Sequence, residues 1–260
     1  MSFKRISFFG LPLDVNGSAD DICNLVGEKN PASFITILEP DAWHLAKNNP
    51  EYVENLNKLS TVVTDGRFVA FACQFFTRLK CQSMSFDMTS LAKPFFQAAV
   101  KAKASIAIVG GQPRDDEDVQ EKLKKYFPGI EIVETTHGFG EFAPKIELIL
   151  AKKPKIVIAA IGAPRQEAFL LALRDAGFKG VAIGCGRFID HYVEPVDYNE
   201  YPEWVDQYHL APLYRLYREP QRLWQRYIFQ YGYFAVLVVK GLFGMLTDKG
   251  ENVATRLAKK

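Results

Sequence analysis

The stretch IVIAAIGAPRQE, residues 156–167, constrains the fold of this chain more than any other. Its first six residues are apolar, include two β-branched pairs and have no polar break, which is typical of a strand buried on both faces of a parallel sheet. Gly162 then permits a sharp turn, and Pro164 is compatible with the first turn of a helix. A strand that leads into a helix N-terminus presents unpaired N–H groups and a positive dipole to a ligand. Residues 162–167 are therefore either one wall of a ligand site or a plain connection.

Strand and helix patterns alternate on both sides of this stretch. Apolar runs predict strands over residues 5–13, 34–38, 61–63, 105–109, 130–134, 156–161 and 181–184. Helical periodicity and capping residues predict helices over residues 20–26, 50–59, 67–80, 88–104, 115–126, 142–151 and 165–176, with a further helix around Trp43 and Leu45. In the helix over 67–80, Phe68, Phe71, Phe75 and Leu79 share one face. The alternation predicts an α/β fold, a mostly parallel Rossmann-like sheet with helices on both faces.

Polar and glycine-rich turns follow several of the predicted strands. Asp65 stands just after strand 61–63 in the sequence Thr-Asp-Gly, and Gly110–Gly111 follows strand 105–109. A carboxylate at the carboxyl end of a strand can act as a general base, because a pocket there raises its pKa by desolvation. Asp-Gly is also a common turn dipeptide. The residues alone therefore leave Asp65 as either a catalytic base or part of an ordinary turn.

Composition excludes several classes of protein. The 260 residues carry a formal net charge of only +2, so no global field recruits nucleic acid. The spacing of the four cysteines and four histidines matches neither a zinc site nor a redox pair, so we expect buried reduced thiols and no protein-built metal site. The N-terminus has no convincing signal-peptide core and is interpreted as a first strand. Neither GxGxxG nor GxxxxGK[ST] occurs, which argues against a dinucleotide fingerprint and a P-loop.

From residue 194 the sequence becomes acidic, aromatic and proline-containing, with little periodic pattern. This change predicts a catalytic domain over residues 1–194 and an appendage over 195–260. Four arginines recur there at intervals of three, four and four, so that one helix presents them in a single stripe: Arg215, Arg218, Arg222 and Arg226. Such a stripe suits a diphosphate or anionic lipid headgroups, or else is a solvated face paired with acids such as Glu219. The apolar, aromatic residues 228–246 favour a segment at a membrane surface, or a helix packed on the main domain or in an oligomer.

Six of these features together resemble the WecG/TagA/CpsF family of bacterial glycosyltransferases over roughly residues 5–230. They occur in the family's order: Thr64-Asp65-Gly66 is similar to A-D-G, Gly110-Gly111 to G-G, Gly138-Phe139 to G-Y-F, GAPRQE at 162–167 to G-[AS]-P-K-Q-E, Gly184-x-Gly186 with Asp190 to G-V-G-G-x-x-D, and YRLYREPQRLWQRY at 214–227 to Y-R-L-x-x-E-P-x-R. The resemblance implies metal-independent, inverting transfer of a sugar from a UDP-sugar to a polyprenyl-diphosphate-linked saccharide in cell-surface polysaccharide synthesis. It also implies a peripheral protein on the cytoplasmic face of the membrane, with no cofactor beyond the UDP-sugar donor.

The resemblance assigns roles to individual residues. Asp65 would take the proton of the acceptor hydroxyl, and Gln166 would position the donor or the transition state. Arg215 and Arg222 would stabilise the UDP leaving group in place of a metal ion. The remaining predicted substrate-binding residues are Thr36, Glu39, Gln82, Gly110, Gly111, Phe139, Gly162, Ala163, Pro164, Arg165, Glu167, Gly186, Asp190, Arg218 and Arg226.

Four features depart from the family pattern. Glu39 stands where the family usually has Asn, Gln82 where it has Arg, and Ser85 where it has Gly. The arginine of the family's R-A-P segment is also missing, and Asp197-Tyr198-Asn199 stands near that place. A gained acid and lost cations favour a neutral hexose or N-acetylhexosamine donor over a uronate. They also keep open a catalytically degenerate homologue that binds a nucleotide-sugar or a partner protein. A nicotinamide-dependent oxidoreductase is a weaker alternative because GxGxxG is absent, and the acceptor glycan and a homo-oligomeric state are left open.

Overall fold

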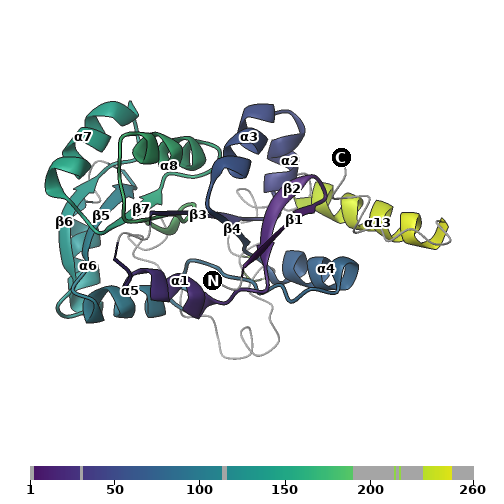
Figure 1. Cartoon of the computed structure of the whole chain (residues 1–260), viewed down its shortest axis with the longest axis horizontal. Coiled ribbons are helices and arrows are strands. Elements are labelled where there is room, and N and C mark those ends of the chain that lie inside the picture. The colour runs from purple at the N-terminus through teal and green to yellow at the C-terminus, as the bar shows by residue number, and fades with distance from the viewer. Residues whose placement is uncertain are drawn as a thin grey trace.

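The computed structural model describes residues 3–29, 32–112, 116–189, 214, 217 and 231–247, and it confirms the predicted fold class. Six parallel strands form one sheet in the order β4-β3-β8-β7-β5-β6 (Figure 1). Their bounds are β3 (Ser33–Leu38), β4 (Thr61–Thr64), β5 (Ser105–Gly110), β6 (Glu131–Thr136), β7 (Ile156–Ala160) and β8 (Val181–Gly184). The sheet is thus wholly parallel, as continuous apolar strands alternating with helices require.

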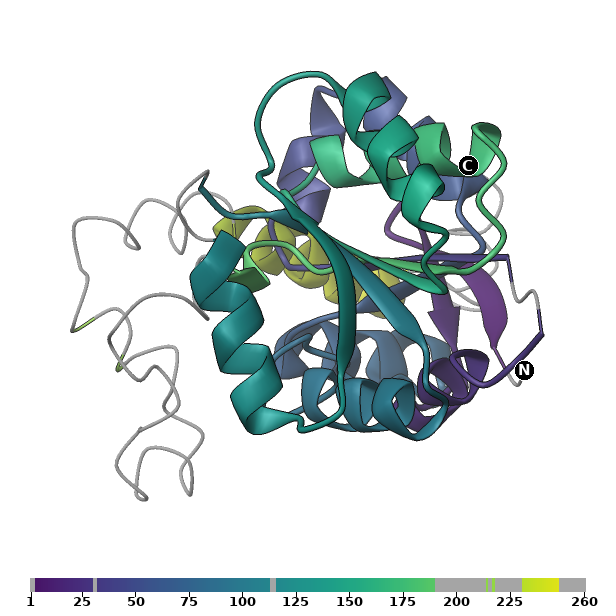
Figure 2. The same ribbon diagram turned by 90° about the vertical axis from the view of Figure 1, so that its left-hand side faces the viewer.

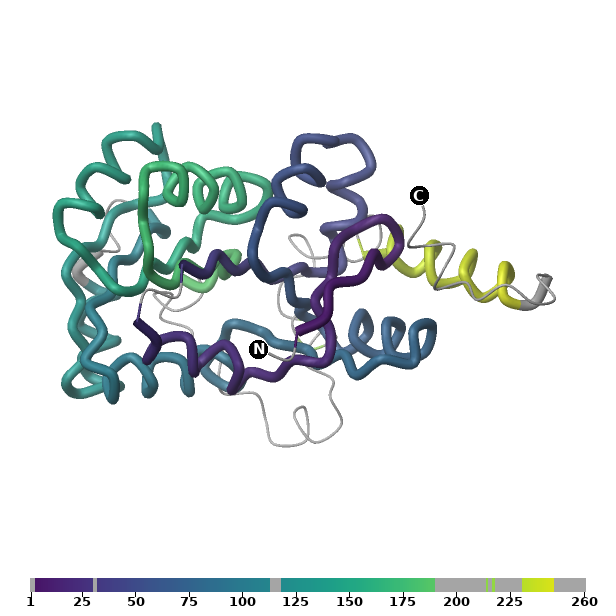
Figure 3. The backbone as a smooth tube through the Cα atoms, in the orientation of Figure 1, coloured from purple at the N-terminus to yellow at the C-terminus, as the bar shows by residue number. Residues whose placement is uncertain are grey.

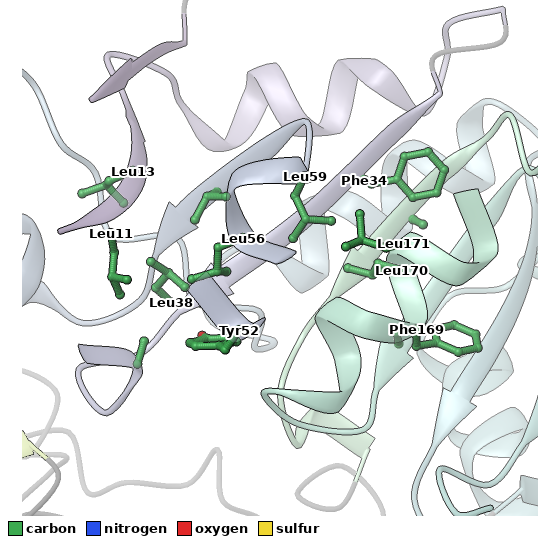
Figure 4. Packing of buried hydrophobic residues seen from close by; sticks show 14 of the residues in the cluster. Leu11, Leu13, Phe34, Leu38, Tyr52, Leu56, Leu59, Phe169, Leu170 and Leu171 are labelled. Atoms are coloured by element: carbon green, nitrogen blue, oxygen red, sulfur yellow. The ribbon is translucent and has the colours of Figure 1, made fainter. Parts of the chain in front are cut away.

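Helices cover both faces of the sheet (Figures 1 and 2). One face carries α3 (Pro50–Lys58), α7 (Phe142–Lys152) and α8 (Arg165–Asp175), and the other carries α1 (Ala19–Leu25), α5 (Ala92–Lys101) and α6 (Asp116–Tyr126). Successive strand residues point to opposite faces, so each strand contributes to both layers. In β7, Val157 packs in the same cluster as Phe169 of α8, whereas Ile158 packs in the cluster of Phe95 of α5. Figure 4 shows part of the first cluster, in which leucines of α3 and α8 meet side chains of β3.

The single strand expected over residues 5–13 is wrong. The chain forms an antiparallel hairpin of β1 (Lys4–Phe8) and β2 (Leu11–Val15), because Phe9 and Gly10 both adopt positive φ, 48° and 86°, and reverse it. Asp14 of β2 accepts a hydrogen bond from the backbone N–H of Val62 at 2.7 Å and pairs with Arg5 at 2.6 Å. The hairpin therefore lies along the outer edge of β4 and satisfies part of that edge's backbone hydrogen bonding.

Two predicted helices are shorter than expected. The helix predicted over 88–104 begins only at Ala92, because Asp87 holds the preceding residues in a turn through the backbone N–H of Thr89 at 2.8 Å. The helix predicted over 67–80 is α4 (Arg67–Thr77), which ends where Arg78 takes the left-handed conformation.

The C-terminal helix α13 (Gly232–Thr247) packs on the hairpin and on α2 (Ala42–Lys47), as Figure 3 shows at one end of the molecule. Phe234 is fully buried, with its ring centroid 4.6 Å from that of Trp43 and 6.3 Å from that of Phe8. Of the two interpretations of residues 228–246, packing on the main domain therefore describes the inner face of this helix. In the described part of the chain, no helix is both long enough and apolar enough to cross a bilayer. The predicted domain boundary at residue 194 lies outside the described residues.

Candidate active site

The carboxyl ends of all six parallel strands meet at one edge of the sheet, and most of the predicted site residues lie there. β3 and β4 extend to one side of the sheet and β5 and β6 to the other, with β8 and β7 between them. Open α/β sheets bind ligands at such a change of direction. Across the sheet, the residues that follow the strands are Asp65, Glu39, Gly186, Gly162, Gly111 and Phe139.

Asp65 is held firmly at the end of β4. Its backbone N–H donates to the carbonyl of Leu38 at 2.8 Å, which extends the pairing of β4 with β3 by one residue. Its Oδ1 accepts the N–H of Gly66 at 2.6 Å, and its Oδ2 accepts the hydroxyl of Ser85 at 3.0 Å. Gly66 has φ 89°, a conformation that admits glycine readily and turns the chain into α4. The carboxylate is thereby fixed at the carboxyl edge of the sheet.

The pKa of Asp65 is raised to about 6, first by burial and then by the negative charge of Glu39. The hydrogen bonds from Ser85 and Gly66 favour the ionised form and oppose this rise. A carboxylate with this pKa is largely ionised at neutral pH and still accepts a proton readily. Those are the properties of a general base.

Glu39 lies between the ends of β3 and β8 and reaches toward the C-terminal segment. A Cβ atom placed on Gly186 would lie 3.3 Å from its Oε1. Its Oε2 accepts a hydrogen bond from the hydroxyl of Tyr231 at 3.2 Å, one residue before α13 begins. Glu39 therefore connects the turn after β8 with the residue that precedes the C-terminal helix.

Gln166 is only 2% exposed, and both ends of its amide bond to the protein. Its Oε1 accepts the backbone N–H of Gly186 at 2.9 Å, and its Nε2 donates to the hydroxyl of Thr36 at 3.2 Å. The side chain thus fastens the turn after β8 to the start of α8. Direct contact of Gln166 with the donor or the transition state stays a prediction.

Glu167 is fully buried beside Gln166. Its Oε1 accepts hydrogen bonds from Thr36 Oγ1 at 2.6 Å and from Gln166 Nε2 at 3.0 Å. Its Oε2 has no hydrogen-bond partner among the described residues, and burial raises its pKa, which favours a bound proton. Thr36, Gln166 and Glu167 form one buried network between β3 and the start of α8, and their contacts with substrate stay predictions.

The opposite part of the edge is formed by glycine turns. A Cβ atom on Gly110 would lie 2.5 Å from the carbonyl oxygen of Ala160, so only glycine fits between β5 and β7 there. The N–H of Gly138 donates to the carbonyl of Gly111 at 3.2 Å, and Phe139 beside it is half-exposed. At these turns backbone groups, rather than large side chains, border the carboxyl ends of β5 and β7.

The start of α8 completes this wall. The Arg165 guanidinium donates to the carbonyl of Gly140 at 2.7 Å and lies 5.3 Å from the ring centroid of Phe142. The turn before α8 contains Gly162 and Ala163, and the bond from Ala163 to Pro164 is cis. Arg165 therefore ties the loop after β6 to this turn.

Gln82 is exposed beside the short bridge between Thr64 and Ser83, and its contact with substrate stays a prediction. The predicted site residues that lie outside the described part of the chain are Asp190, Arg215, Arg218, Arg222 and Arg226. Sequence reasoning gave no role to Ser85 or Tyr231, and only the departure of Ser85 from the family pattern could have drawn attention to it.

The cysteines and the acidic side chains are the residues that could hold a metal ion. All four cysteines are free and buried, as predicted. Among the described residues, no group of three or more His, Cys, Asp or Glu side chains is arranged to hold a metal ion.

Comparison with known proteins decides the family. The model of the glycosyl transferase WecG/TagA/CpsF family matches residues 6–246. The chain belongs to this family. This WecG/TagA/CpsF member is 26% identical over 199 residues to the UDP-Gal:alpha-D-GlcNAc-diphosphoundecaprenol beta-1,4-galactosyltransferase of Shigella boydii, covering 75% of this chain and 81% of that protein.

Two Bacillus relatives share another name, N-acetylglucosaminyldiphosphoundecaprenol N-acetyl-beta-D-mannosaminyltransferase. The one from Bacillus spizizenii is 28% identical over 202 residues, which is 76% of each chain. The one from Bacillus subtilis is 26% identical over 196 residues, 75% of this chain and 74% of that protein. The resemblance inferred from the six motifs is therefore confirmed, and the WecG/TagA/CpsF chain is a glycosyltransferase.

Proposed function

We propose that this glycosyltransferase moves a neutral hexose or N-acetylhexosamine from a UDP-sugar to a polyprenyl-diphosphate-linked saccharide. The relatives support the acceptor class, because all three are named for a GlcNAc-diphosphoundecaprenol substrate. They also support a neutral donor sugar, since one name specifies galactose and two specify N-acetylmannosamine. The observation that carries the reaction is the partly buried carboxylate of Asp65 at the carboxyl edge of the sheet, with a pKa of about 6.

Asp65 acts as the general base of a single displacement. The acceptor hydroxyl gives its proton to the carboxylate while its oxygen attacks the anomeric carbon of the donor. The bond from that carbon to the diphosphate breaks, and UDP leaves with the electron pair. A single displacement from the face opposite the leaving group inverts the anomeric configuration.

The negative charge on the diphosphate needs a counter-charge as UDP leaves. We assign this task to Arg215 and Arg222, together with Arg226, because the sequence spaces these cations at helical intervals. Guanidinium groups bind phosphate oxygens in pairs of parallel hydrogen bonds. The reaction then requires no divalent ion.

Glu39 selects against carboxylated sugars. Its carboxylate faces the turn at Gly186 and raises the pKa of Asp65, so two acidic groups act on the same part of the cleft. A uronate carboxylate brought to about 4 Å from Glu39 would meet a repulsion of about 4 kcal/mol at an effective dielectric of 20. That cost corresponds to roughly a thousandfold discrimination.

The proposed acceptor class also places the reaction at the membrane surface. A lipid-linked saccharide keeps its diphosphate at the bilayer surface, so the enzyme must reach that plane. The protein is proposed to associate peripherally with the cytoplasmic leaflet, where nucleotide-sugars are present. Its C-terminal helix, apolar on its outer face, lies at one end of the molecule (Figure 1).

The test is a panel of donors offered with a synthetic GlcNAc-diphospho-lipid in the presence of EDTA. UDP-galactose, UDP-glucose, UDP-N-acetylglucosamine, UDP-N-acetylmannosamine and the corresponding uronates are compared by kcat/KM. A neutral sugar should be transferred with inversion, and Glu39→Gln should raise the use of uronates. Preference for a uronate would contradict the donor assignment, and loss of all transfer in EDTA would contradict the role given to the arginines. Calorimetric binding of UDP-sugars without any transfer would instead identify a catalytically degenerate homologue.

A further inference from the structure

The hydrogen bond between Tyr231 and Glu39 joins two segments that are 192 positions apart along the chain. The Tyr231 hydroxyl donates to Glu39 Oε2 at 3.2 Å, and both side chains are partly buried. A hydrogen bond to a carboxylate is assisted by charge, and partial burial protects it from competition with water. The contact therefore can hold the Glu39 carboxylate in one place.

The protein fixes the Tyr231 end of this bond through the first turn of α13. This helix lies beside α2 (Figure 1). The ring of Phe234 packs on that of Trp43 at 4.6 Å between centroids, and the Tyr233 ring centroid lies 5.5 Å from Lys47 Nζ. Because these contacts involve the residues directly after Tyr231, they also set where its hydroxyl lies.

The backbone at the Glu39 end is fixed by the same helix α2. The carbonyl of Glu39 accepts the backbone N–H of Ala42 at 3.0 Å, at the residue where α2 begins. A glutamate side chain still has three rotatable bonds, so the position of its carboxylate depends on what its oxygens bind. With Oε2 on Tyr231, Oε1 lies 3.3 Å from where a Cβ atom of Gly186 would be.

We propose that Tyr231 is a positioning residue for Glu39 and, through Glu39, a determinant of donor-sugar selectivity. The inference rests on the proposed role of Glu39 in excluding carboxylated sugars. Tyr231 holds the Glu39 carboxylate beside the turn at Gly186, where its charge repels a uronate. Tyr231 acts through Glu39 and makes no contact with the sugar. Packing of α13 on α2 thereby contributes to the choice of donor.

The expected size of the effect follows from Coulomb's law. The repulsion between two carboxylates falls in inverse proportion to the distance between them. A Glu39 side chain that is released from Tyr231 can turn toward solvent and move its charge from about 4 Å to about 8 Å from a uronate. Halving the repulsion reduces a roughly thousandfold discrimination to roughly thirtyfold.

The test is the Kd of the full chain for matched donors, measured by calorimetry without acceptor. UDP-galactose is compared with UDP-galacturonate, and UDP-N-acetylmannosamine with its uronate. Tyr231→Phe removes only the hydroxyl, so it should bind the uronate about thirtyfold more tightly and the neutral sugar within about twofold. Tyr233→Phe is the matched control, because Tyr233 contacts α2 through its ring, and it should discriminate as the unmodified chain does.

A double variant separates positioning from a direct effect of Tyr231. Glu39→Gln should lose the discrimination, and adding Tyr231→Phe should change the Kd ratio no further, because no charge remains to be positioned. Hydrogen exchange in α13 should be the same in Tyr231→Phe as in the unmodified chain, since Phe234 still packs on Trp43.

Two results would overturn the positioning role alone. Full discrimination by Tyr231→Phe, together with its loss in Glu39→Gln, would mean that Glu39 keeps its place without Tyr231. An equal loss of discrimination in Tyr233→Phe would assign the effect to a general loosening of the helix. A uronate that the unmodified chain binds as tightly as the neutral sugar would instead refute the proposed donor class, and the role of Tyr231 with it.

Discussion

Replacing Glu39 by Gln is expected to extend activity to lower pH. A general base works in its deprotonated form, so transfer falls as pH drops through the pKa of Asp65, which lies at about 6 rather than at the ordinary 3.8. The charge of Glu39 is one cause of that rise, after burial. Neutralising it lowers the pKa of Asp65 and moves the acidic limb of the profile to lower pH.

The size of the effect follows from the ionised fraction of Asp65. With a pKa of about 6, roughly a tenth of the carboxyl groups are ionised at pH 5. If Glu39→Gln lowers this pKa by about one unit, roughly half are ionised at pH 5. The value of kcat/KM at pH 5, relative to its own plateau at pH 8, should then rise about fivefold over that of the unmodified enzyme.

The assay is kcat/KM for the acceptor at saturating donor between pH 4.5 and 8.5. Ser85→Ala provides a contrast of opposite sign, because the Ser85 hydrogen bond lowers the pKa of Asp65 and its loss should move the limb upward. Glu147→Gln, at an exposed position of α7, is the matched control for charge and should leave the limb unchanged. An acidic limb that does not move in Glu39→Gln, or that lies near pH 4 in the unmodified enzyme, would refute the reasoning.

Three further substitutions test the structure itself. Asp65→Asn should stabilise the fold at pH 7.5 by up to about 3 kcal/mol in urea titrations. The pKa of Asp65 in the folded state, about 6, lies above the ordinary 3.8, so the ionised carboxylate destabilises the fold at high pH. The gain should vanish below about pH 4, where the carboxyl group is protonated in both states. Phe234→Ala should cost about 3–5 kcal/mol and speed hydrogen exchange throughout α13, and unchanged exchange there would contradict the packing described. Gly110→Ala should cost roughly 1–3 kcal/mol because its Cβ meets the carbonyl of Ala160, whereas Gly244→Ala, with nothing within 4 Å, should leave the melting temperature unchanged or higher.

The sequence predicts the layers of this fold well because its strands are buried on both faces. β7 is a continuous apolar run with every residue buried, so its type could be assigned without knowing its neighbours. The strand order could not be obtained in this way. Glu39 and Gly186 become neighbours only because β8 inserts beside β3, although 147 positions separate them along the chain.

The errors also have physical reasons. The sequence predicts a single strand through Phe9 because a large apolar side chain is typical of a strand. Nothing in the sequence indicates the left-handed backbone conformation that Phe9 adopts. Periodicity correctly placed Phe68, Phe71 and Phe75 on one face of α4, but periodicity alone does not say which face meets the core. The buried hydrogen bonds of Gln166 to Thr36 and Gly186 could not be obtained from the sequence, because they join residues that are far apart along the chain.

The most direct test of the account is the turnover of Asp65→Asn measured together with donor binding. If Asp65 is the base, kcat should fall by about 10²- to 10⁴-fold. The Kd for the UDP-sugar should stay within about twofold, because the side chain keeps its size and acts on the acceptor hydroxyl. Transfer by Asp65→Asn at close to the unmodified rate, with the donor bound normally, would contradict the central claim.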